Sequence, residues 1–232
     1  MRSTSLVAAA MALAAYPRSA HSQAAGLSAA YAMDEGSGTT ISDKSGNNNT
    51  GTLTNGPTWT TGKYGGALLF DGVNDRVRVN DSNSLDLTTA ATFEAWVYPT
   101  VAPAGWRTIM QKEVDAYLLS ASGGGSGNKP VSAGTVNGVC CVQVAGVAAL
   151  PVNTWTHVAA SYDGSQLRLY VNGALVASTA VTGSYQVNTN PLWIGGNAVY
   201  GEHFQGKLDE LRIYNRALTQ AEIQQDMTTA IQ

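Results

Sequence analysis

The sequence predicts an all-β protein, an antiparallel two-sheet β-sandwich that ends in one short C-terminal helix. Short apolar runs with period-two alternation recur along the chain, and turn-forming residues separate them, with glycine alone occurring 25 times. Charged residues make up only 12% of the chain, and no strand-helix-strand alternation is visible. Roughly ten or more short strands without such alternation favour a sandwich or jelly roll over a parallel sheet.

The first residues are expected to be removed before folding. Residues 1–24 contain a positive Arg2 and an apolar run from Leu6 to Ala15 that is too short to span a bilayer, followed by small residues suited to cleavage. This pattern predicts a signal peptide, and a frayed apolar N-terminus of a cytosolic protein is the alternative. We therefore expect a secreted or periplasmic protein whose mature domain covers residues 25–232.

Composition disfavours two classes of partner. The net charge is -3 and no polybasic patch is present, so neither nucleic acid nor an anionic membrane is an expected partner. No apolar run beyond the N-terminal segment approaches the length of a transmembrane helix. The remaining chain suits one core and contains no Pro/Ser-rich linker. We expect a single, monomeric domain.

The first half of the mature chain contains three clear strand signals. The segment ALLFDG ends a strand at Asp71-Gly72, where the turn begins. RVRVND, residues 76–81, alternates Arg with Val and predicts one polar and one apolar face. ATFEAWVYP, residues 91–99, carries large side chains on both faces, which is typical of a central strand.

The second half predicts further strands and the helix. Residues 155–178 contain Asp163-Gly164 and Asn172-Gly173, two turns that divide the segment into three consecutive antiparallel strands. LWIGG and the long alternating run GKLDELRIYNRAL follow as strands. Thr219 with Glu222 three residues later forms a capping-box pattern, which predicts a short terminal helix.

Five ordered segments give the chain a family resemblance. AYAMDEGSGTTISDKSGNNNTGTL, ALLFDGVNDRVRV, TFEAWVYP, WTHVAASYDGSQLRLYVNG and GKLDELRIYNRALTQAEI resemble the successive signatures of bacterial laminin-G-like, concanavalin A-like jelly-roll domains. The resemblance covers nearly the whole mature chain and implies two curved antiparallel sheets whose relatives bind sugars at the concave face or the loop rim. Because such domains also serve in adhesion and as appendages of glycanases, the fold does not fix the activity.

The resemblance also implies a calcium ion, which many relatives hold. It brings the MDEGSG and KLDE segments together, so that Asp34 and Asp209 are the expected ligands of a structural Ca2+. Asp43 and Asp71 are further candidates, and Asx-turns are an equally good explanation of both. The two cysteines, Cys140 and Cys141, are adjacent. We expect two thiols on opposite faces of a strand, with a redox-labile pair as the alternative.

The preferred function is carbohydrate binding by a non-catalytic, lectin-like module. Trp59 and Trp106 lie in segments rich in Gly, Pro and Thr, where alternation does not bury a large ring, and aromatic faces stack on pyranose rings. Tyr200, Glu202 and His203 in the segment NAVYGEHFQG offer polar contacts. Three tryptophans inside strand patterns are expected to pack instead: Trp96, Trp155 and Trp193.

A glycoside hydrolase is disfavoured because no acidic cluster follows one strand. Asp209 and Glu210 are adjacent, so alternation predicts that they point to opposite faces and cannot act on one sugar. A protein-binding adhesion module is a further alternative.

The enzymatic alternative is a polysaccharide lyase acting on a uronate-containing glycan at the concave face. Its acid-base and carboxylate-binding groups would be His157, Tyr170, Arg168, Arg212 and Glu94. The preferred interpretation of the same residues is an ion-pair network between Glu94 and Arg212 with a structural, hydrogen-bonding His157.

Overall fold

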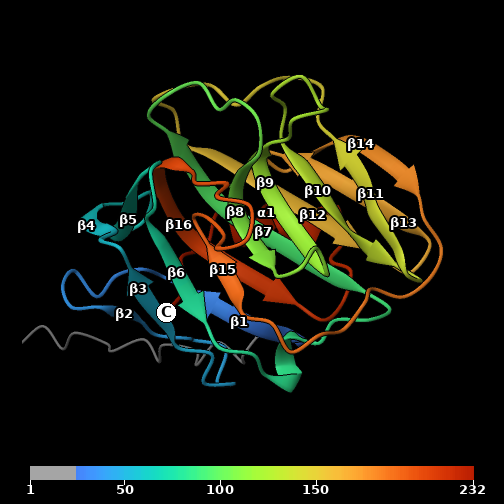
Figure 1. Cartoon of the computed structure of the whole chain (residues 1–232), viewed down its shortest axis with the longest axis horizontal. Coiled ribbons are helices and arrows are strands. Elements are labelled where there is room, and N and C mark those ends of the chain that lie inside the picture. Colours follow the sequence, from blue (N-terminus) through green and yellow to red (C-terminus); the bar gives the residue numbers. More distant parts are fainter. Residues whose placement is uncertain (1–24) are drawn as a thin grey trace, which may run out of the picture.

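A computed structural model describes residues 25–232, so the predicted signal peptide of residues 1–24 lies outside the described residues. The chain forms two eight-stranded antiparallel sheets packed face to face, with one α-helix, which confirms the predicted sandwich (Figure 1). In the part of the chain that the structure describes, no helix is long and apolar enough to cross a membrane.

We call the two sheets A and B. Sheet A has the order β14 (Ala174–Ala180), β13 (Gln166–Val171), β12 (Thr156–Tyr162), β7 (Ala91–Pro99), β16 (Gln205–Tyr214), β5 (Gly66–Asp71) and β4 (Thr58–Thr61), with β1 (Leu27–Tyr31) paired to β16. Sheet B has the order β11 (Val139–Ala145), β10 (Val131–Val136), β9 (Tyr117–Ser122), β8 (Arg107–Lys112), β15 (Leu192–Ile194), β6 (Arg76–Val79), β3 (Gly51–Thr54) and β2 (Thr40–Ile41). The short 3-10 helix η1 (Asn83–Leu85) and the helix α1 (Gln220–Met227) complete the fold.

The predicted local signals form as expected. β7 pairs with β12 on one side and β16 on the other, so it is central. Gly164 and Gly173 adopt positive φ values of 85° and 72° in the two hairpin turns, a conformation that glycine adopts without strain. Thr219 caps α1 in a reciprocal capping box with Glu222.

The core lies between the two sheets and leaves each sheet with an outer face. Phe93 of β7 stacks on Tyr117 of β9 across the sandwich, with ring centroids 4.8 Å apart. Alternation then turns Glu94 and Trp96 to the outer face of sheet A. A separate apolar cluster that includes Ile223 of α1 covers part of this outer face. Within residues 25–232, no helix packs on the outer face of sheet B.

A β-bulge in β16 changes the orientation of two acidic residues. The register to β7 shifts between Asp209 and Arg212, and Glu210 has a φ of 53°. Leu208 and Leu211 both lie in the core between the sheets, so Asp209 and Glu210 both belong to the outer face of sheet A. The prediction that these two carboxylates point to opposite faces is wrong, because alternation fails at a bulge.

A second bulge carries the cysteines. The register between β10 and β11 shifts between Gly134 and Val136, where Cys141 adopts a φ of 67°. Cys140 and Cys141 form a disulfide. The prediction of two separate thiols on opposite faces is therefore wrong, because the bulge removes the extended conformation on which it depended.

Candidate functional site

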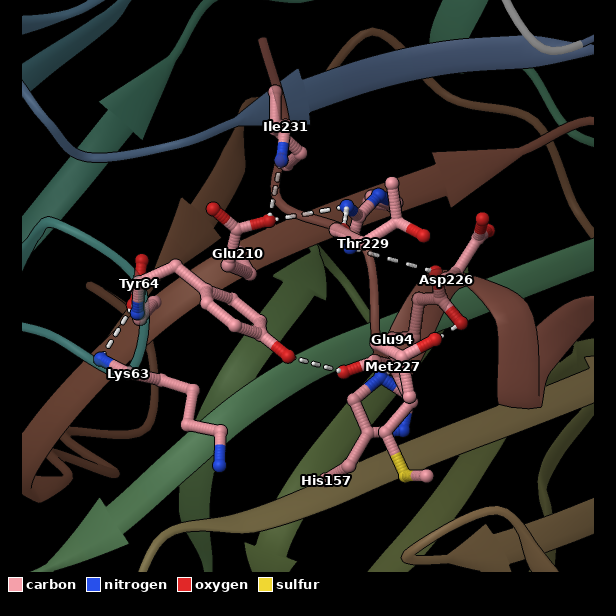
Figure 2. Close-up of polar contacts among 12 residues, drawn as sticks. Lys63, Tyr64, Glu94, His157, Glu210, Asp226, Met227, Thr229 and Ile231 are labelled. Carbon is pink, nitrogen blue, oxygen red and sulfur yellow. Dashed lines mark hydrogen bonds and ion pairs between the residues drawn. The ribbon is translucent and has the colours of Figure 1, made fainter.

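Four of the five residues proposed for a lyase lie beneath the C-terminal segment and not along an open face. Glu94 and His157 are fully buried, and 5% of Arg212 is exposed. Ile223 of α1 packs with Tyr170 and its neighbours on this face. Figure 2 shows Glu94 and His157 next to Asp226 and Met227, the last residues of the helix.

Hydrogen bonds attach the C-terminal residues to this buried polar layer. The Tyr64 hydroxyl donates to the Met227 carbonyl at 3.0 Å, and the Ile231 amide donates to Glu210 at 2.7 Å (Figure 2). Arg212 pairs with Glu210 at 3.0 Å and, more distantly, with Glu94 at 3.9 Å. Arg212 therefore pairs mainly with Glu210, and the predicted pair of Glu94 with Arg212 is present only as a 3.9 Å contact without a hydrogen bond.

Burial sets the protonation of this layer. It raises the pKa of Glu94 well above the usual value, against the opposing charge of Arg212 and with the help of Asp226. It lowers the pKa of His157 to about 3, and Arg212 acts in the same direction. The ring nitrogens of His157 have no hydrogen-bond partner among the described residues, so the expected hydrogen-bonding role is not observed; its Nε2 lies 3.9 Å from Glu94.

The remaining lyase residue is separated from this layer. Arg168 forms an ion pair with Asp163 at 2.7 Å, and about a third of its side chain is exposed. Proton transfer to a polysaccharide requires groups within hydrogen-bond reach of the sugar. The structure places Glu94, His157 and Arg212 under the C-terminal segment instead.

The predicted calcium ligands flank one turn. An Asp34 oxygen accepts from the Gly66 amide, and Asp209 Oδ2 accepts from the amides of Lys63 and Tyr64 at 2.7 and 3.0 Å. The second oxygen, Asp209 Oδ1, is buried and has no donor among the described residues. One unpartnered oxygen supplies only one of the several oxygen ligands that calcium prefers, and calcium binding at Asp34 and Asp209 stays a prediction.

Asp43 and Asp71 are explained by local turns. Asp43 accepts from the Ser45 and Asn49 amides, and Asp71 accepts from Val73 at 2.8 Å. Both patterns are those of side chains that stabilise turns.

The outer face of sheet B carries a pocket in which predicted ligand-binding residues meet. It has a volume of about 190 Å3. Trp106 comes from the β7–β8 connection, and Tyr200 and Glu202 come from the loop between β15 and β16. The lining residues are Trp106, Asp115, Leu118, Ala133, Gly134, Cys141, Tyr200 and Glu202.

Trp106 forms the apolar part of this site. Its indole is half-buried and packs against a small outer cluster of Leu118, Val131 and Ala133, which β9 and β10 bring side by side. This cluster is separate from the main core. The ring therefore has a packed support while part of it remains open to a ligand.

Hydrogen bonds hold the polar side chains of the pocket. Asp115 accepts from Gln111 Nε2 at 2.7 Å and from the Tyr200 hydroxyl at 2.8 Å. Burial raises the pKa of Tyr200 to about 12, and the bond to Asp115 contributes, so the phenol stays a donor at neutral pH. Glu202 accepts from Asn197 Nδ2 at 2.8 Å. Burial also raises the pKa of Glu202, while its bond to Asn197 opposes this shift.

The loop that carries Tyr200 is fixed to sheet B. The Thr108 amide of β8 donates to the Glu202 carbonyl at 3.2 Å, and buried Glu113 accepts from the Val199 amide and from Trp193 Nε1 at 3.1 and 2.8 Å. The pocket wall is thus positioned by the sheet and not left to a free loop.

Two predicted ligand-binding residues lie elsewhere. Trp59 is not in a loop but in β4 of sheet A, where it is half-buried against the core and donates to the Gly38 carbonyl. His203 lies in the predicted loop but does not line the pocket. Burial lowers the pKa of its imidazole, and Arg76 contributes to this shift.

Sequence reasoning missed five lining residues, namely Asp115, Leu118, Ala133, Gly134 and Cys141. Those on β9, β10 and β11 meet only through the pairing of these strands, with Ala133 opposite Leu118 and close to the β11 bulge, whereas Asp115 lies in the connection between β8 and β9. No motif in the sequence specifies that register.

Solved structures resemble this fold at low sequence identity. Domain 4 of AbnA, a GH43 extracellular arabinanase from Geobacillus stearothermophilus, in complex with arabinotriose, has a TM-score of 0.70 at 24% identity, covering 87% of this chain and 98% of that chain. The binding domain of Paraclostridial Mosquitocidal Protein 1 has a TM-score of 0.72 at 16% identity, covering 87% and 52%. The Botulinum Neurotoxin serotype G binding domain has a TM-score of 0.67 at 14% identity, covering 87% and 50%.

Curated relatives match only a part of the chain. Pappalysin-1 from Mus musculus is 40% identical over 80 residues, which is 32% of this chain and 5% of that protein. The Homo sapiens protein is 38% identical over the same length and the same shares. A family model matches residues 70–224, more than half of the chain. The chain therefore belongs to the family that this model describes, the concanavalin A-like lectin/glucanases superfamily.

Proposed function

We propose that this protein is a non-catalytic carbohydrate-binding domain whose site is the pocket on the outer face of sheet B. The observation that carries the proposal is the convergence of Trp106, Tyr200 and Glu202 in one pocket. A supported indole provides a stacking surface for a sugar ring, and fixed polar groups read its hydroxyls. Sugar binding by the related arabinanase domain, which is described in complex with arabinotriose, supports the same class of ligand.

The lyase alternative receives less support from the geometry. Its proposed acid-base groups, His157 and Glu94, are fully buried beneath the C-terminal helix. The open pocket contains no histidine among its lining residues. A polysaccharide could reach His157 and Glu94 only if the helix moved away, whereas the pocket at Trp106 is already open.

We infer further that the protein acts outside the cytoplasm, as its N-terminal sequence predicts. The Cys140–Cys141 disulfide supports this inference, because disulfides persist in oxidising compartments and are rare in the cytosol.

The proposal is tested by titrating the mature chain with soluble neutral polysaccharides, namely arabinan, galactan, xylan and mixed-linkage β-glucan, in a calorimeter. Trp106→Ala is expected to weaken binding by about 1–3 kcal/mol, or roughly 5- to 150-fold. Trp155→Ala is the matched control, because this tryptophan is also half-buried but packs on Tyr98 of sheet A. Its affinity is expected to match that of the unaltered chain. Trp59→Ala shows whether the second predicted platform contributes.

Three results would contradict the proposal. Binding that survives Trp106→Ala would move the site elsewhere. A stability loss of about 3–5 kcal/mol in Trp106→Ala would identify the ring as core packing. Release of reducing or unsaturated sugars during incubation would show an enzyme, and Glu202→Gln and His157→Gln would then locate the chemistry in the pocket or beneath α1.

A further inference from the structure

The charges of the pocket select among glycans. The ionisable acids that line it are Asp115 and Glu202, and within the described residues no Lys, Arg or His lines it. The nearby Arg107 turns its guanidinium to the Trp106 carbonyl at 2.7 Å and lines a different, smaller cavity with Pro103 and Phe204. A ligand in the pocket therefore meets carboxylates without a compensating cation in the wall.

We propose, resting on the carbohydrate-binding function above, that the ligand is a neutral glycan and not a uronate-containing one. Sugar hydroxyls are donors, and charge-assisted hydrogen bonds to a carboxylate are roughly twice as strong as neutral ones. A glycan carboxylate in the same place has no donor to offer and is repelled. At about 4 Å near a protein surface, one like-charge contact costs about tenfold in affinity or more.

The carboxylates of Asp115 and Glu202 are held in orientations that let them accept hydrogen bonds from a ligand. Gln111 and Tyr200 orient Asp115, and Asn197 orients Glu202, so the remaining lone pairs of each carboxylate have a fixed direction. Asp115 and Glu202 therefore present fixed hydrogen-bond acceptors to the hydroxyl groups of a ligand in the pocket.

The test compares neutral polymers with an anionic one, and its central pair is one polymer with its carboxyl groups esterified or free. Homogalacturonan is used fully methyl-esterified, which is neutral, and de-esterified, which is anionic, beside the neutral panel named above. The neutral form or a neutral panel member is expected to bind at least about tenfold more tightly than the anionic form. Asp115→Asn is expected to narrow this ratio, and so is Glu202→Gln. Asparagine tolerates the positive φ of 54° at position 115, so folding should be preserved.

The outcomes separate this inference from the proposed function. If the de-esterified polymer binds best and Trp106→Ala abolishes that binding, the pocket binds sugar but the charge argument is overturned. An unchanged ratio in both acid variants also overturns it. If no polymer of either charge binds, the proposed function fails and this inference fails with it.

A separate observation concerns the disulfide. Cys141 lines the same pocket as Trp106, and both cysteines are exposed on β11, the edge strand of sheet B. The Asp115 carboxylate and the two sulfurs lie within 4.8 Å of one another. The disulfide therefore stands next to a carboxylate that the first inference assigns to ligand binding.

We infer that the Cys140–Cys141 disulfide is a reducible wall of the glycan pocket. Because it joins adjacent residues, it closes no long loop and contributes little to the stability of the sandwich. It fixes the polarisable sulfur of Cys141 in the pocket wall, with the sulfur of Cys140 bonded to it. Once reduced, two thiols rotate independently, and ordering them on binding costs affinity, about two- to tenfold for one or two side chains.

A phosphine reductant tests this inference with a balanced reaction. The S–S bond breaks, the phosphorus is oxidised by taking oxygen from one water molecule, and the two hydrogens of that water end on the two sulfurs. Mass spectrometry after alkylation counts the thiols. The polymer that binds the oxidised protein is then titrated into the reduced protein without air, into the reoxidised protein, and into the double variant Cys140→Ser, Cys141→Ser.

The expected result is a two- to tenfold loss of affinity on reduction, recovery on reoxidation, the same loss in the double variant and a melting temperature that changes by less than about 2 °C. Equal affinity in all forms would overturn the inference and leave the Trp106 site standing. A large fall in melting temperature would assign the disulfide to the fold. Absence of any binding polymer would remove the inference together with the proposed function.

Discussion

Acid sensitivity of His157 is the sharpest prediction for the buried layer of sheet A. The pKa of the folded-state imidazole is about 3, against 6.5 for an exposed histidine, because burial and Arg212 oppose its charge. Below pH 6.5 the unfolded chain therefore binds a proton that the folded chain does not bind. Stability present above pH 6.5 is lost as the pH falls toward 3. Between pH 7 and pH 5 the loss is about 2 kcal/mol for this one group.

Other groups in the layer act in the opposite direction. Burial raises the pKa of Asp209 to about 6 and of Glu210 to about 7, and it raises that of Glu94 as well. These carboxyls stabilise the folded state at low pH, and that contribution is lost as the pH rises through their folded values. In the unaltered protein, these carboxyls mask the effect of His157 on the pH dependence of stability. The informative quantity is therefore the difference between the unaltered protein and His157→Gln, which does not titrate.

The assay is urea unfolding of both proteins at pH 7 and pH 5. From pH 7 to pH 5, the free energy of unfolding of the unaltered protein is expected to fall by about 2 kcal/mol more than that of His157→Gln. Because Glu94 lies 3.9 Å from His157, the comparison is repeated in a Glu94→Gln background to remove their coupling. A difference below about 0.5 kcal/mol in both backgrounds would refute the conclusion that the fold keeps His157 neutral.

Three further predictions concern the ends of the domain. We propose that Ca2+ at Asp34 and Asp209 stabilises the fold by about 2.7 kcal/mol when present at a hundred times its Kd, so EDTA should lower the melting temperature, and Asp209→Ala should abolish that response. An unchanged melting curve in EDTA would contradict this. Thr219→Ala should cost about 1 kcal/mol in urea unfolding through loss of the α1 cap, whereas the exposed Thr228→Ala beyond the helix should cost less. Protein recovered from an exporting host should begin near Ala25 by N-terminal sequencing, and an intact Met1 on secreted protein would refute the predicted cleavage.

The sequence allowed most of the fold to be predicted because its signals are local. Alternation identified β7 as a central strand, dipeptides such as Asn172-Gly173 marked the hairpins, and Thr219 marked the start of α1. Alternation failed where one residue is inserted into a ladder. The bulges at Glu210 and Cys141 reversed the expected directions of their side chains, and neither position carries the glycine that commonly marks such a site.

Residues of the candidate site were predicted only where they lie in loops, because turn-rich composition marks a loop in the sequence. Trp106, Tyr200 and Glu202 stood in turn-rich segments and do line the pocket. Trp59 stood in a similar segment, yet it pairs within β4 and packs on the core, because a strand of four residues is too short for its alternation to stand out from a loop. Asp115 depends on strand pairing between distant segments, which a single sequence does not specify.

The two outer faces contain the same kinds of residue and differ in what covers them. Sheet A presents a tryptophan, a histidine, acids and an arginine, a set suited to sugar chemistry. The end of α1 and the residues after it lie over the histidine and the acids (Figure 2), and Lys63 and Tyr64 pack on Trp96. Sheet B presents Trp106, Tyr200 and two acids with no helix packed against them in the described chain. Residue type therefore makes both faces candidate sites. They differ in coverage, because the eight-residue helix that begins after the Thr219 capping box packs on one of them. A helix that buries a polar face removes its chemistry from solvent, and this coverage of sheet A favours the proposed site on the open face of sheet B.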